Sequence, residues 1–183
     1  MQILMLVVGL VAGFFLPGFL MSKLLGIKAN ALSSFLVSCV LLFQTIFWID
    51  VFRVQVCFTS VLGVLLALSA LLFVLVMKFQ KTGPGKILDT SEFTFDFKFS
   101  PFMIPLGLVV LLILVRSVLQ PFNYSDAEFR WNHFALKLME FRNFNFYPPL
   151  TSGDFMAYFY VDGIPPMVSF SYFWIYSSYG VPE

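Results

Sequence analysis

The sequence predicts an all-α integral membrane protein. Of its 183 residues, 60% are hydrophobic and 11% are charged, whereas an ordinary soluble domain has about 25% charged residues. The mean hydropathy is +0.90. Several uncharged runs reach the length of about 20 residues that a helix needs to cross a bilayer. We therefore expect four transmembrane helices, an outward loop with an amphipathic interfacial helix, and the start of a fifth span.

Composition and charge also exclude some partners and sites. The net charge of +1 is too small to indicate nucleic acid, and the chain has no basic run interleaved with aromatic residues. Cys39 and Cys57 lie inside apolar runs, which predicts small buried side chains rather than a disulfide or a metal pair. The sequence has no zinc-ligand spacing, no phosphate-binding glycine loop and no serine nucleophile elbow. Soluble-enzyme chemistry is therefore not expected.

Residues 1–78 predict a three-helix membrane anchor. The first span, residues 3–21, is too long for the core of a signal peptide and lacks a basic start, so we expect it to be retained. Its glycines and proline indicate either a helix-contact face with a kink near its end or small residues that a spanning helix merely tolerates. These residues are Gly9, Gly13, Pro17 and Gly18.

The second and third spans are expected at residues 31–49 and 54–77. Asn30 or Ser33 can cap the second span, and a tight polar turn with Asp50 and Arg53 should follow it. In the third span, small residues recur at three- and four-residue spacing, which predicts a stripe that packs closely against another helix. The stripe consists of Ser60, Gly63, Ala67 and Ala70.

Residues 79–100 are expected to form a cytoplasmic or interfacial link, and residues 101–120 a fourth span. In the link, phenylalanines alternate with other residues over positions 93–99, which is typical of an extended segment at a membrane surface. Arg116 lies near the far end of the fourth span. Its guanidinium either reaches the lipid head groups along its aliphatic stem or faces a polar cavity or a lipid phosphate.

The lysines predict the orientation of the chain. The positive-inside bias places the link between the first two spans and the link between the third and fourth spans in the cytoplasm. The lysines concerned are Lys23, Lys28, Lys78, Lys81 and Lys86. The amino terminus, the Asp50 turn and residues 121–166 are then expected on the non-cytoplasmic side of a cell inner membrane.

Residues 121–166 form the predicted outward loop and include the only histidine. Residues 125–128 match a capping box, which predicts an interfacial helix over residues 125–141. The apolar side of this helix should face the bilayer or other helices, and it consists of Trp131, Phe134, Ala135, Leu138 and Phe141. The polar residues fall along one stripe of Asp126, Arg130, His133, Lys137 and Glu140.

This polar stripe has two interpretations. It is either a solvated helix face with local ion pairs or part of a site at the membrane surface. Asp126 is expected to stay ionised, because it lies at a helix amino terminus and near Arg130. A lone histidine such as His133 is more often a hydrogen-bonded structural residue than a catalyst.

The remainder of the loop is aromatic and is interrupted by prolines and glycines. It predicts an ordered segment at the membrane surface, with a short helix over residues 152–160 that Asp154 can cap. Asp162 and the glycine after it indicate a turn. Residues 167–183 are expected to begin a further membrane segment.

The order of these features resembles the membrane glycosyltransferases of the GT-C superfamily, which includes protein mannosyltransferases and lipid A aminoarabinose transferases. In that family, a helix leaves the membrane into a long first outer loop with an early acidic residue and interfacial helices, and the next span follows. Here the predicted fourth span precedes SDAEFRWNHFALKLMEF, with Asp126, and an aromatic loop that ends in YVDGIPPMVSFSYFWIY. The resemblance covers residues 101–179 and depends on this layout rather than on a strict motif.

The resemblance implies transfer of a sugar from a polyprenyl-phosphate donor to an acceptor outside the cytoplasm. It implies that Asp126 acts as a base or orients the acceptor hydroxyl, while a cation stabilises the departing phosphate. The cationic or imidazole groups available for phosphate or acceptor contacts are Arg116, Arg130, His133 and Lys137. Glu128 or Asp162 is the candidate for a second acidic group. The resemblance implies no definite cofactor, but it is compatible with a divalent metal.

Two features depart from the family pattern. Three predicted spans precede the resembling module, and residues 1–183 do not include the many further spans that enclose the lipid donor in the family. Catalysis by these residues alone is therefore not expected. The competing interpretation is a non-catalytic accessory or structural subunit that docks onto other membrane protein subunits. A transporter is not favoured, because only Arg116 is charged within a predicted span.

Overall fold

The computed structural model describes residues 2–27, 29–82, 130–159 and 166–180, together with the helical positions Leu108, Leu111, Leu112 and Val115. All regular secondary structure in these residues is helical. Within these described ranges, three stretches are long and apolar enough to cross a membrane, namely Gln2–Leu24, Ala31–Val51 and Phe58–Phe79. The protein is therefore helical and embedded in a membrane through at least these segments.

Several sequence predictions fall outside the described residues. Residues 83–100 of the link predicted at 79–100 and the capping box at residues 125–128 are among them, whereas residues 79–82 are described and helical. The predicted fourth span at residues 101–120 is described at only the four single positions named above, which are helical and exposed. The fourth span therefore stays a prediction.

The first span is interrupted near its end, as the proline predicted. Helix α1 (Gln2–Phe14) stops one residue before α2 (Leu16–Leu24), and Pro17 lies in the first turn of α2. Proline has no N–H, and its ring clashes with the carbonyl four residues earlier, so it kinks or interrupts a helix at this position. The interruption directs the N–H of Gly18 to the hydroxyl of Ser38 on α3 (Ala31–Val51), at 2.9 Å.

The glycines of the first span confirm the helix-contact interpretation. A Cβ on Gly18 would collide with the backbone of α3, and a Cβ on Gly9 or Gly13 would collide with side chains of α8 (Met167–Tyr179). The neighbour of Gly9 is Ser178, and the neighbour of Gly13 is the indole of Trp174. This close approach of backbones is the usual advantage of small residues between membrane helices.

Helix α3 begins and ends with well-defined local structure. Asn30 accepts a hydrogen bond from Ser33 N at 2.8 Å, and Ser33 Oγ accepts one from Asn30 N at 3.1 Å, so both predicted capping residues contribute. The helix ends at Val51, and Arg53 has a left-handed backbone with φ of 56°. The polar turn predicted at Asp50 and Arg53 is therefore confirmed.

The predicted contact stripe on the third span is wrong. In α4 (Phe58–Thr82), Gly63, Ala67 and Ala70 are exposed, and no neighbouring atom of the described residues lies within 4 Å of the Cβ position of Gly63. The buried face consists of Val61, Leu65, Ser69 and Leu72. Because the first span already supplies small residues at the contacts, bulky side chains of α4 fill the remaining space.

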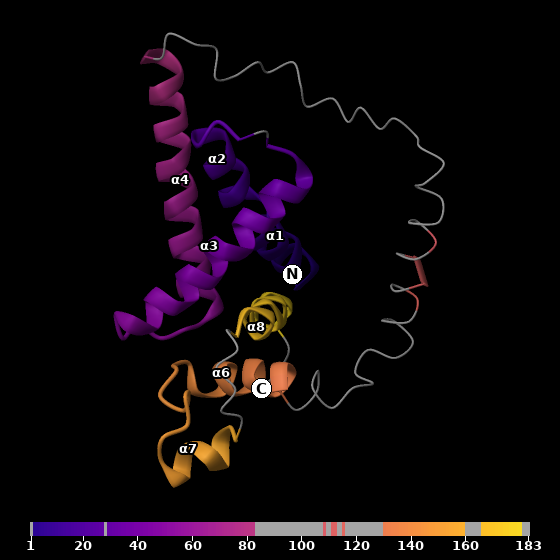
Figure 1. Ribbon diagram of the computed structural model, residues 1–183, viewed down its shortest axis with the longest axis vertical. Coiled ribbons are helices and arrows are strands. Elements are labelled where there is room, and N and C mark those ends of the chain that lie inside the picture. The colour runs from indigo at the N-terminus through magenta and orange to yellow at the C-terminus, as the bar shows by residue number, and fades with distance from the viewer. Residues whose placement is uncertain are drawn as a thin grey trace.

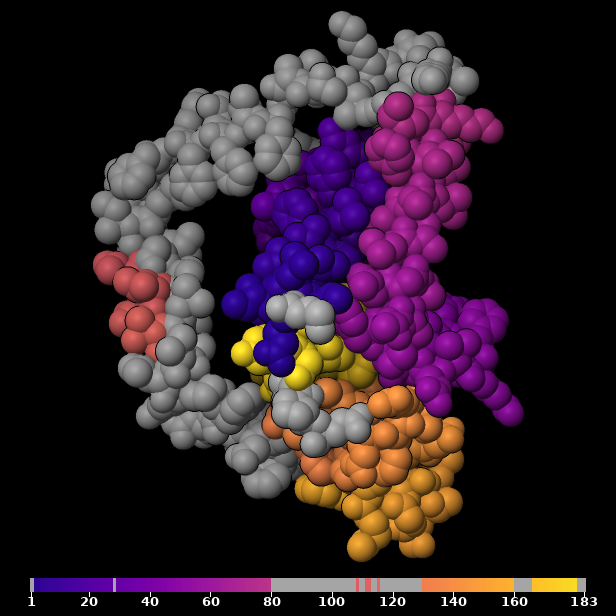
Figure 2. Space-filling view, turned by 180° about the vertical axis from the view of Figure 1, so that it is seen from behind, coloured from indigo at the N-terminus to yellow at the C-terminus, as the bar shows by residue number. Residues whose placement is uncertain are grey.

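Three shorter helices gather at one end of the membrane helices, and we refer to them as the loop module. They are α6 (His133–Phe141), α7 (Ser152–Ala157) and α8. Figure 1 shows α8 lying across the end of the long helices, between them and α6. The space-filling view from behind shows α6 and α7 in orange beyond α8 in yellow, next to the indigo amino-terminal helix (Figure 2).

The core connects the loop module to the membrane helices. Its buried apolar residues come from α3, the turn before α4, α4, α6, the loop around α7, and α8. They include Leu42, Ile46, Val56, Leu65, Phe134, Leu138, Phe146, Tyr158, Phe170 and Trp174. The short helix predicted at residues 152–160 is confirmed over Ser152–Ala157, and residues 167–179 are helical. A further membrane span beginning at α8 stays a prediction.

Candidate functional site

Helix α6 presents the apolar face that the sequence predicted. Phe134, Ala135 and Leu138 are at most 1% exposed, while Phe141 at the end of the helix is 41% exposed. Phe134 lies inside a cluster of rings that includes Phe144, Phe146, Tyr147, Tyr158 and Phe170, with centroid distances from 5.0 to 6.2 Å. The opposite, polar face of α6 therefore has a fixed orientation.

His133 connects α6 to α7. Its Nε2 lies 3.0 Å from the carbonyl oxygen of Ala157, and its ring stacks on Tyr158 with centroids 6.2 Å apart. Because a carbonyl can only accept a hydrogen bond, Nε2 must carry the proton. Nδ1 is then the proton acceptor of the neutral ring. This contact is the structural role expected of a lone histidine, and a phosphate or acceptor contact of His133 stays a prediction.

The other described residues of the polar stripe also have local contacts. Lys137 Nζ pairs with Glu140 Oε2 at 2.7 Å and lies 5.5 Å from the centre of the Phe141 ring. Arg130 is half-buried in a π-helical turn before α6, and its carbonyl accepts a hydrogen bond from the hydroxyl of Tyr158 at 3.4 Å. The local ion pair fits the interpretation of the stripe as a solvated helix face.

The structure brings together only part of the predicted site. Arg130 lies in the turn before α6, and His133 and Lys137 lie on the first two turns of α6. Helix α6 is at the same end of the molecule as the turn between α3 and α4 (Figure 1). The remaining candidates lie outside the described residues, and they are Asp126, Arg116, Glu128 and Asp162. Within the described part of the chain, no group of three or more histidine, cysteine or acidic side chains could hold a metal ion.

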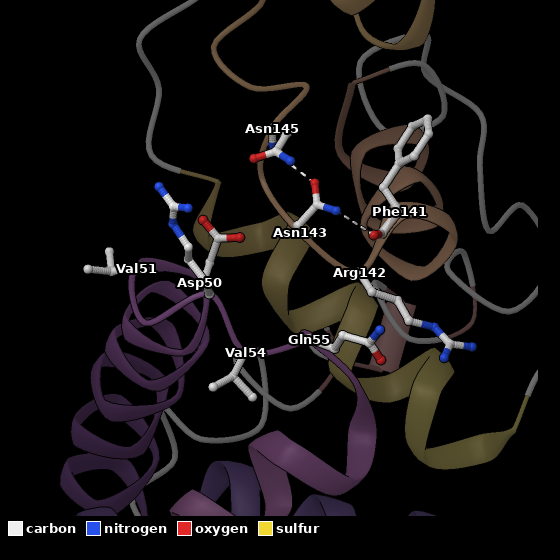
Figure 3. A pocket seen from close by; sticks show the side chains of 9 residues that line it. Asp50, Val51, Val54, Gln55, Phe141, Arg142, Asn143 and Asn145 are labelled. Atoms are coloured by element: carbon white, nitrogen blue, oxygen red, sulfur yellow. Dashed lines mark hydrogen bonds between the residues drawn. The ribbon is translucent and has the colours of Figure 1, made fainter.

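A polar pocket that the sequence analysis did not find lies beside α6. It has a volume of about 530 Å³ and lies between the turn that follows α3 and the segment that follows α6. Figure 3 shows Asp50 on one side, Gln55 and Arg142 on the other, and Asn143 and Asn145 between them. The complete lining is Asp50, Val51, Arg53, Val54, Gln55, Phe141, Arg142, Asn143 and Asn145.

Two hydrogen bonds join the segments that form this pocket. Asp50 Oδ1 accepts from the N–H of Phe144 at 2.9 Å, and the carbonyl of Arg142 accepts from the N–H of Val56 at 2.8 Å. Asn143 shapes the turn, because its side chain donates to Phe141 O at 2.7 Å and accepts from the N–H of Asn145 at 3.0 Å. The pocket is thus held by contacts between residues up to 94 positions apart.

Two arginines of the pocket have an unusual backbone conformation. Arg53 and Arg142 have φ of 56° and 57°. An L-residue in this left-handed conformation is less stable by roughly 1–2 kcal/mol. Such residues occur preferentially at functional sites. Arg53 was predicted only as part of a turn, and Arg142 carries no sequence signal that would connect it with Arg53.

A second hollow of about 290 Å³ shares Arg142 with the polar pocket and includes Cys57. Burial raises the pKa of the Cys57 thiol, but hydrogen bonds with Ser60 and Thr59 outweigh it, so the pKa lies below its usual value. Both Cys39 and Cys57 are free and only half-buried. The absence of a disulfide between them agrees with the prediction, whereas full burial does not.

Comparisons of the chain with protein-family models, with curated proteins and with solved structures found no match. The function must therefore be argued from the chain itself.

Proposed function

We propose that this chain is the amino-terminal part of a membrane glycosyltransferase that moves a sugar from a polyprenyl-phosphate donor to an acceptor on the non-cytoplasmic side. The observation that carries this proposal is the position of α6. Arg130, His133 and Lys137 lie at one end of three apolar helices, where a lipid-linked donor presents its phosphate. The layout that resembles the GT-C superfamily predicts a site in this part of the chain.

The proposed reaction needs a base and a cation. The acceptor hydroxyl loses its proton as its oxygen bonds to the sugar carbon, and Asp126 accepts that proton or orients the hydroxyl. The bond between the sugar carbon and the phosphate oxygen breaks, and the negative charge that develops there is stabilised by Arg116, Arg130 or Lys137. Glu128 or Asp162 supplies the second acidic group. Further spans complete the enclosure of the donor.

The orientation of the chain belongs to the same proposal. The last turn of α2 carries Lys23, and Lys78 lies toward the end of α4. Figure 1 shows these two helix ends at the opposite end of the molecule from the loop module. The positive-inside bias then assigns the lysine end to the cytoplasm and the loop module to the outer side of a cell inner membrane.

The Asp126→Asn variant of the complete protein tests the reaction. We expect sugar transfer from a polyprenyl-phosphate donor to fall by about 100-fold or more, because the amide has the same shape but cannot accept the proton. Glu140→Gln is the matched control, because Glu140 pairs locally with Lys137 on the exposed face of α6. Normal transfer by Asp126→Asn would remove Asp126 from the mechanism, and an equal loss in both variants would assign the loss to folding.

The orientation has a separate test. Met156 on α7 is 89% exposed. A Met156→Cys variant, in a background with Cys39 and Cys57 replaced by serine, should react with a membrane-impermeant thiol reagent added outside intact cells. Labelling only after lysis would reverse the proposed topology.

The second candidate is a non-catalytic accessory subunit of a larger membrane complex. It is favoured by the local contacts on α6, because Lys137 pairs with Glu140 and His133 bonds to Ala157. In these contacts the side chains already have partners within the protein, as a structural role requires. The accessory role predicts that Asp126→Asn changes neither sugar transfer nor the amount of complex that can be purified. It also predicts that disruption of the loop module releases the partner subunits. These two results together would replace the transferase by the accessory role.

A further inference from the structure

Within the described ranges, four residues have a left-handed backbone with positive φ, and each follows the end of a helix. Gly26 follows α2 with φ of 67°, and Gly180 follows α8 with φ of 71°. Arg53 follows α3 and Arg142 follows α6. Glycine is the usual residue at such positions, because it has no Cβ to clash with the backbone. Both arginines line the polar pocket, whereas neither glycine does.

The pocket has the charge of an anion site. Its lining residues include two arginines and one aspartate, so the lining carries an excess of one positive charge. The carboxylate of Asp50 already accepts the N–H of Phe144 through Oδ1. A guanidinium offers five N–H donors in a planar fork that matches the oxygens of a phosphate group. Gln55, Asn143 and Asn145 add neutral polar groups to the lining.

The surroundings of the pocket favour a phosphate attached to a lipid. Trp48 and Phe52, on the last turn of α3 and just beyond it, are 50% and 73% exposed, and their ring centroids lie 6.0 Å apart. Tryptophan and other aromatic residues gather where a membrane helix meets the head groups. Val51 and Val54 form the apolar part of the lining and are about half-exposed. A lipid whose head group binds in the pocket can therefore place its acyl chains along the apolar surface of α3.

We propose that the pocket binds the phosphate head group of a membrane lipid, with Arg53 and Arg142 as its cationic contacts. The site goes beyond the proposed sugar transfer, since it uses none of the residues assigned to that reaction. A lipid bound here contacts the α3–α4 turn and the end of α6 together. It therefore strengthens the attachment of the loop module to the membrane helices.

The test compares lipids and variants with the full chain purified in a neutral detergent. Phosphatidylglycerol should raise the midpoint of thermal unfolding and remain bound in native mass spectra, while a diacylglycerol without phosphate should do neither. In Arg53→Gly and Arg142→Gly, apparent affinity for phosphatidylglycerol should fall about tenfold or more for each substitution, because each removes charge-assisted hydrogen bonds. Glycine suits the left-handed backbone, so the lipid-free midpoint should not fall below that of the natural sequence.

A charge control and a source control complete the experiment. Lys78→Gln removes one positive charge at the far end of α4 and should leave the lipid response unchanged. Glycerol phosphate is tested beside phosphatidylglycerol, because it carries a phosphate group but is water-soluble and has no acyl chains. A response to both phosphates that needs both arginines supports the phosphate site, and a response to phosphatidylglycerol alone supports the lipid as its source. An undiminished response in the Arg53→Gly and Arg142→Gly double variant would overturn the proposal, as would the absence of any response in the natural sequence.

Discussion

The contacts that stabilise the membrane helices differ from those that stabilise the loop module. In the membrane helices, Gly18 lies against the backbone of α3 and donates to Ser38. In the loop module, the buried ring of Phe134 is surrounded by other aromatic rings. Lipid tails are as apolar as leucine, so close backbone approach and hydrogen bonds must stabilise helix contacts there. Helix α6 lies outside the three stretches that are long and apolar enough to span a membrane, and there burial of large apolar rings supplies the stability.

Helix α8 combines both kinds of contact. Phe170 and Phe173 belong to the buried core, while the indole of Trp174 packs against α1 and donates a hydrogen bond to Gly9 O at 2.9 Å. A small residue on α1 therefore accommodates a large ring on α8. We therefore expect that deleting an aromatic ring lowers the free energy of unfolding most in the loop module. Adding a methyl group should lower it most at the glycines that contact another helix.

Phe134→Ala should have the largest effect. Deleting a ring that is 1% exposed should reduce the free energy of unfolding by about 3–5 kcal/mol. The measurement is the thermal or denaturant midpoint in detergent, together with protease cleavage of the loop module. Phe155→Ala on α7, where the ring is 45% exposed, is the control, and an equal loss there would refute the ring-based account.

Gly13→Ala should have the next largest effect. The added Cβ would collide with the indole of Trp174, and overpacking of this kind costs about 1–3 kcal/mol. Gly63→Ala makes the same change on α4, where no neighbouring atom of the described part of the chain lies within 4 Å of the added Cβ, and it should be neutral or stabilising because alanine is the better helix former. Unfolding midpoints measured side by side distinguish the two, and equal effects would argue against the α1–α8 contact.

Ser38→Ala and Ser34→Ala form a closer pair, one turn apart on α3. Ser38→Ala leaves the buried N–H of Gly18 without its acceptor and should cost about 1–3 kcal/mol. Ser34 Oγ is buried and has no hydrogen-bond partner among the described residues, so Ser34→Ala should be neutral or stabilising. The reverse order of midpoints would contradict the hydrogen bond between Gly18 and Ser38.

The smallest expected effect is a pH response of α7. The backbone N–H of Thr151, then its hydroxyl and the N–H of Leu150, lower the pKa of Asp154 below that of an ordinary aspartate. A lowered pKa in the folded state means that the cap contributes stability above the unfolded-state pKa and loses it as the pH falls through the folded-state pKa. The protection of the amides of residues 151–158, measured as exchange relative to an unstructured chain at the same pH, should therefore fall in acid, below about pH 4. Asp154→Asn should remove this pH dependence, and a persistent one would point to another group.

Local sequence patterns predicted the elements well. The interruption at Pro17, the cap by Asn30 and Ser33, and the buried face of α6 all depend on neighbouring residues, and all are confirmed. The stripe of small residues on α4 was wrong, because spacing along one helix cannot say which face meets a neighbour. The candidate site was predicted only in part, since Asp126 lies outside the described residues.

By itself, the sequence determined that the chain enters a membrane, that Asn30 and Ser33 cap α3, that the first span is interrupted near Pro17, and which side of α6 is apolar. These properties depend on composition, periodicity and capping within a few residues. Only the tertiary structure decided that His133 bonds to Ala157, that Trp174 crosses α1, and that Arg53 and Arg142 line one pocket. Each of these contacts joins residues distant in the chain, and the packing of α8 and α6 against the membrane helices brings those residues together.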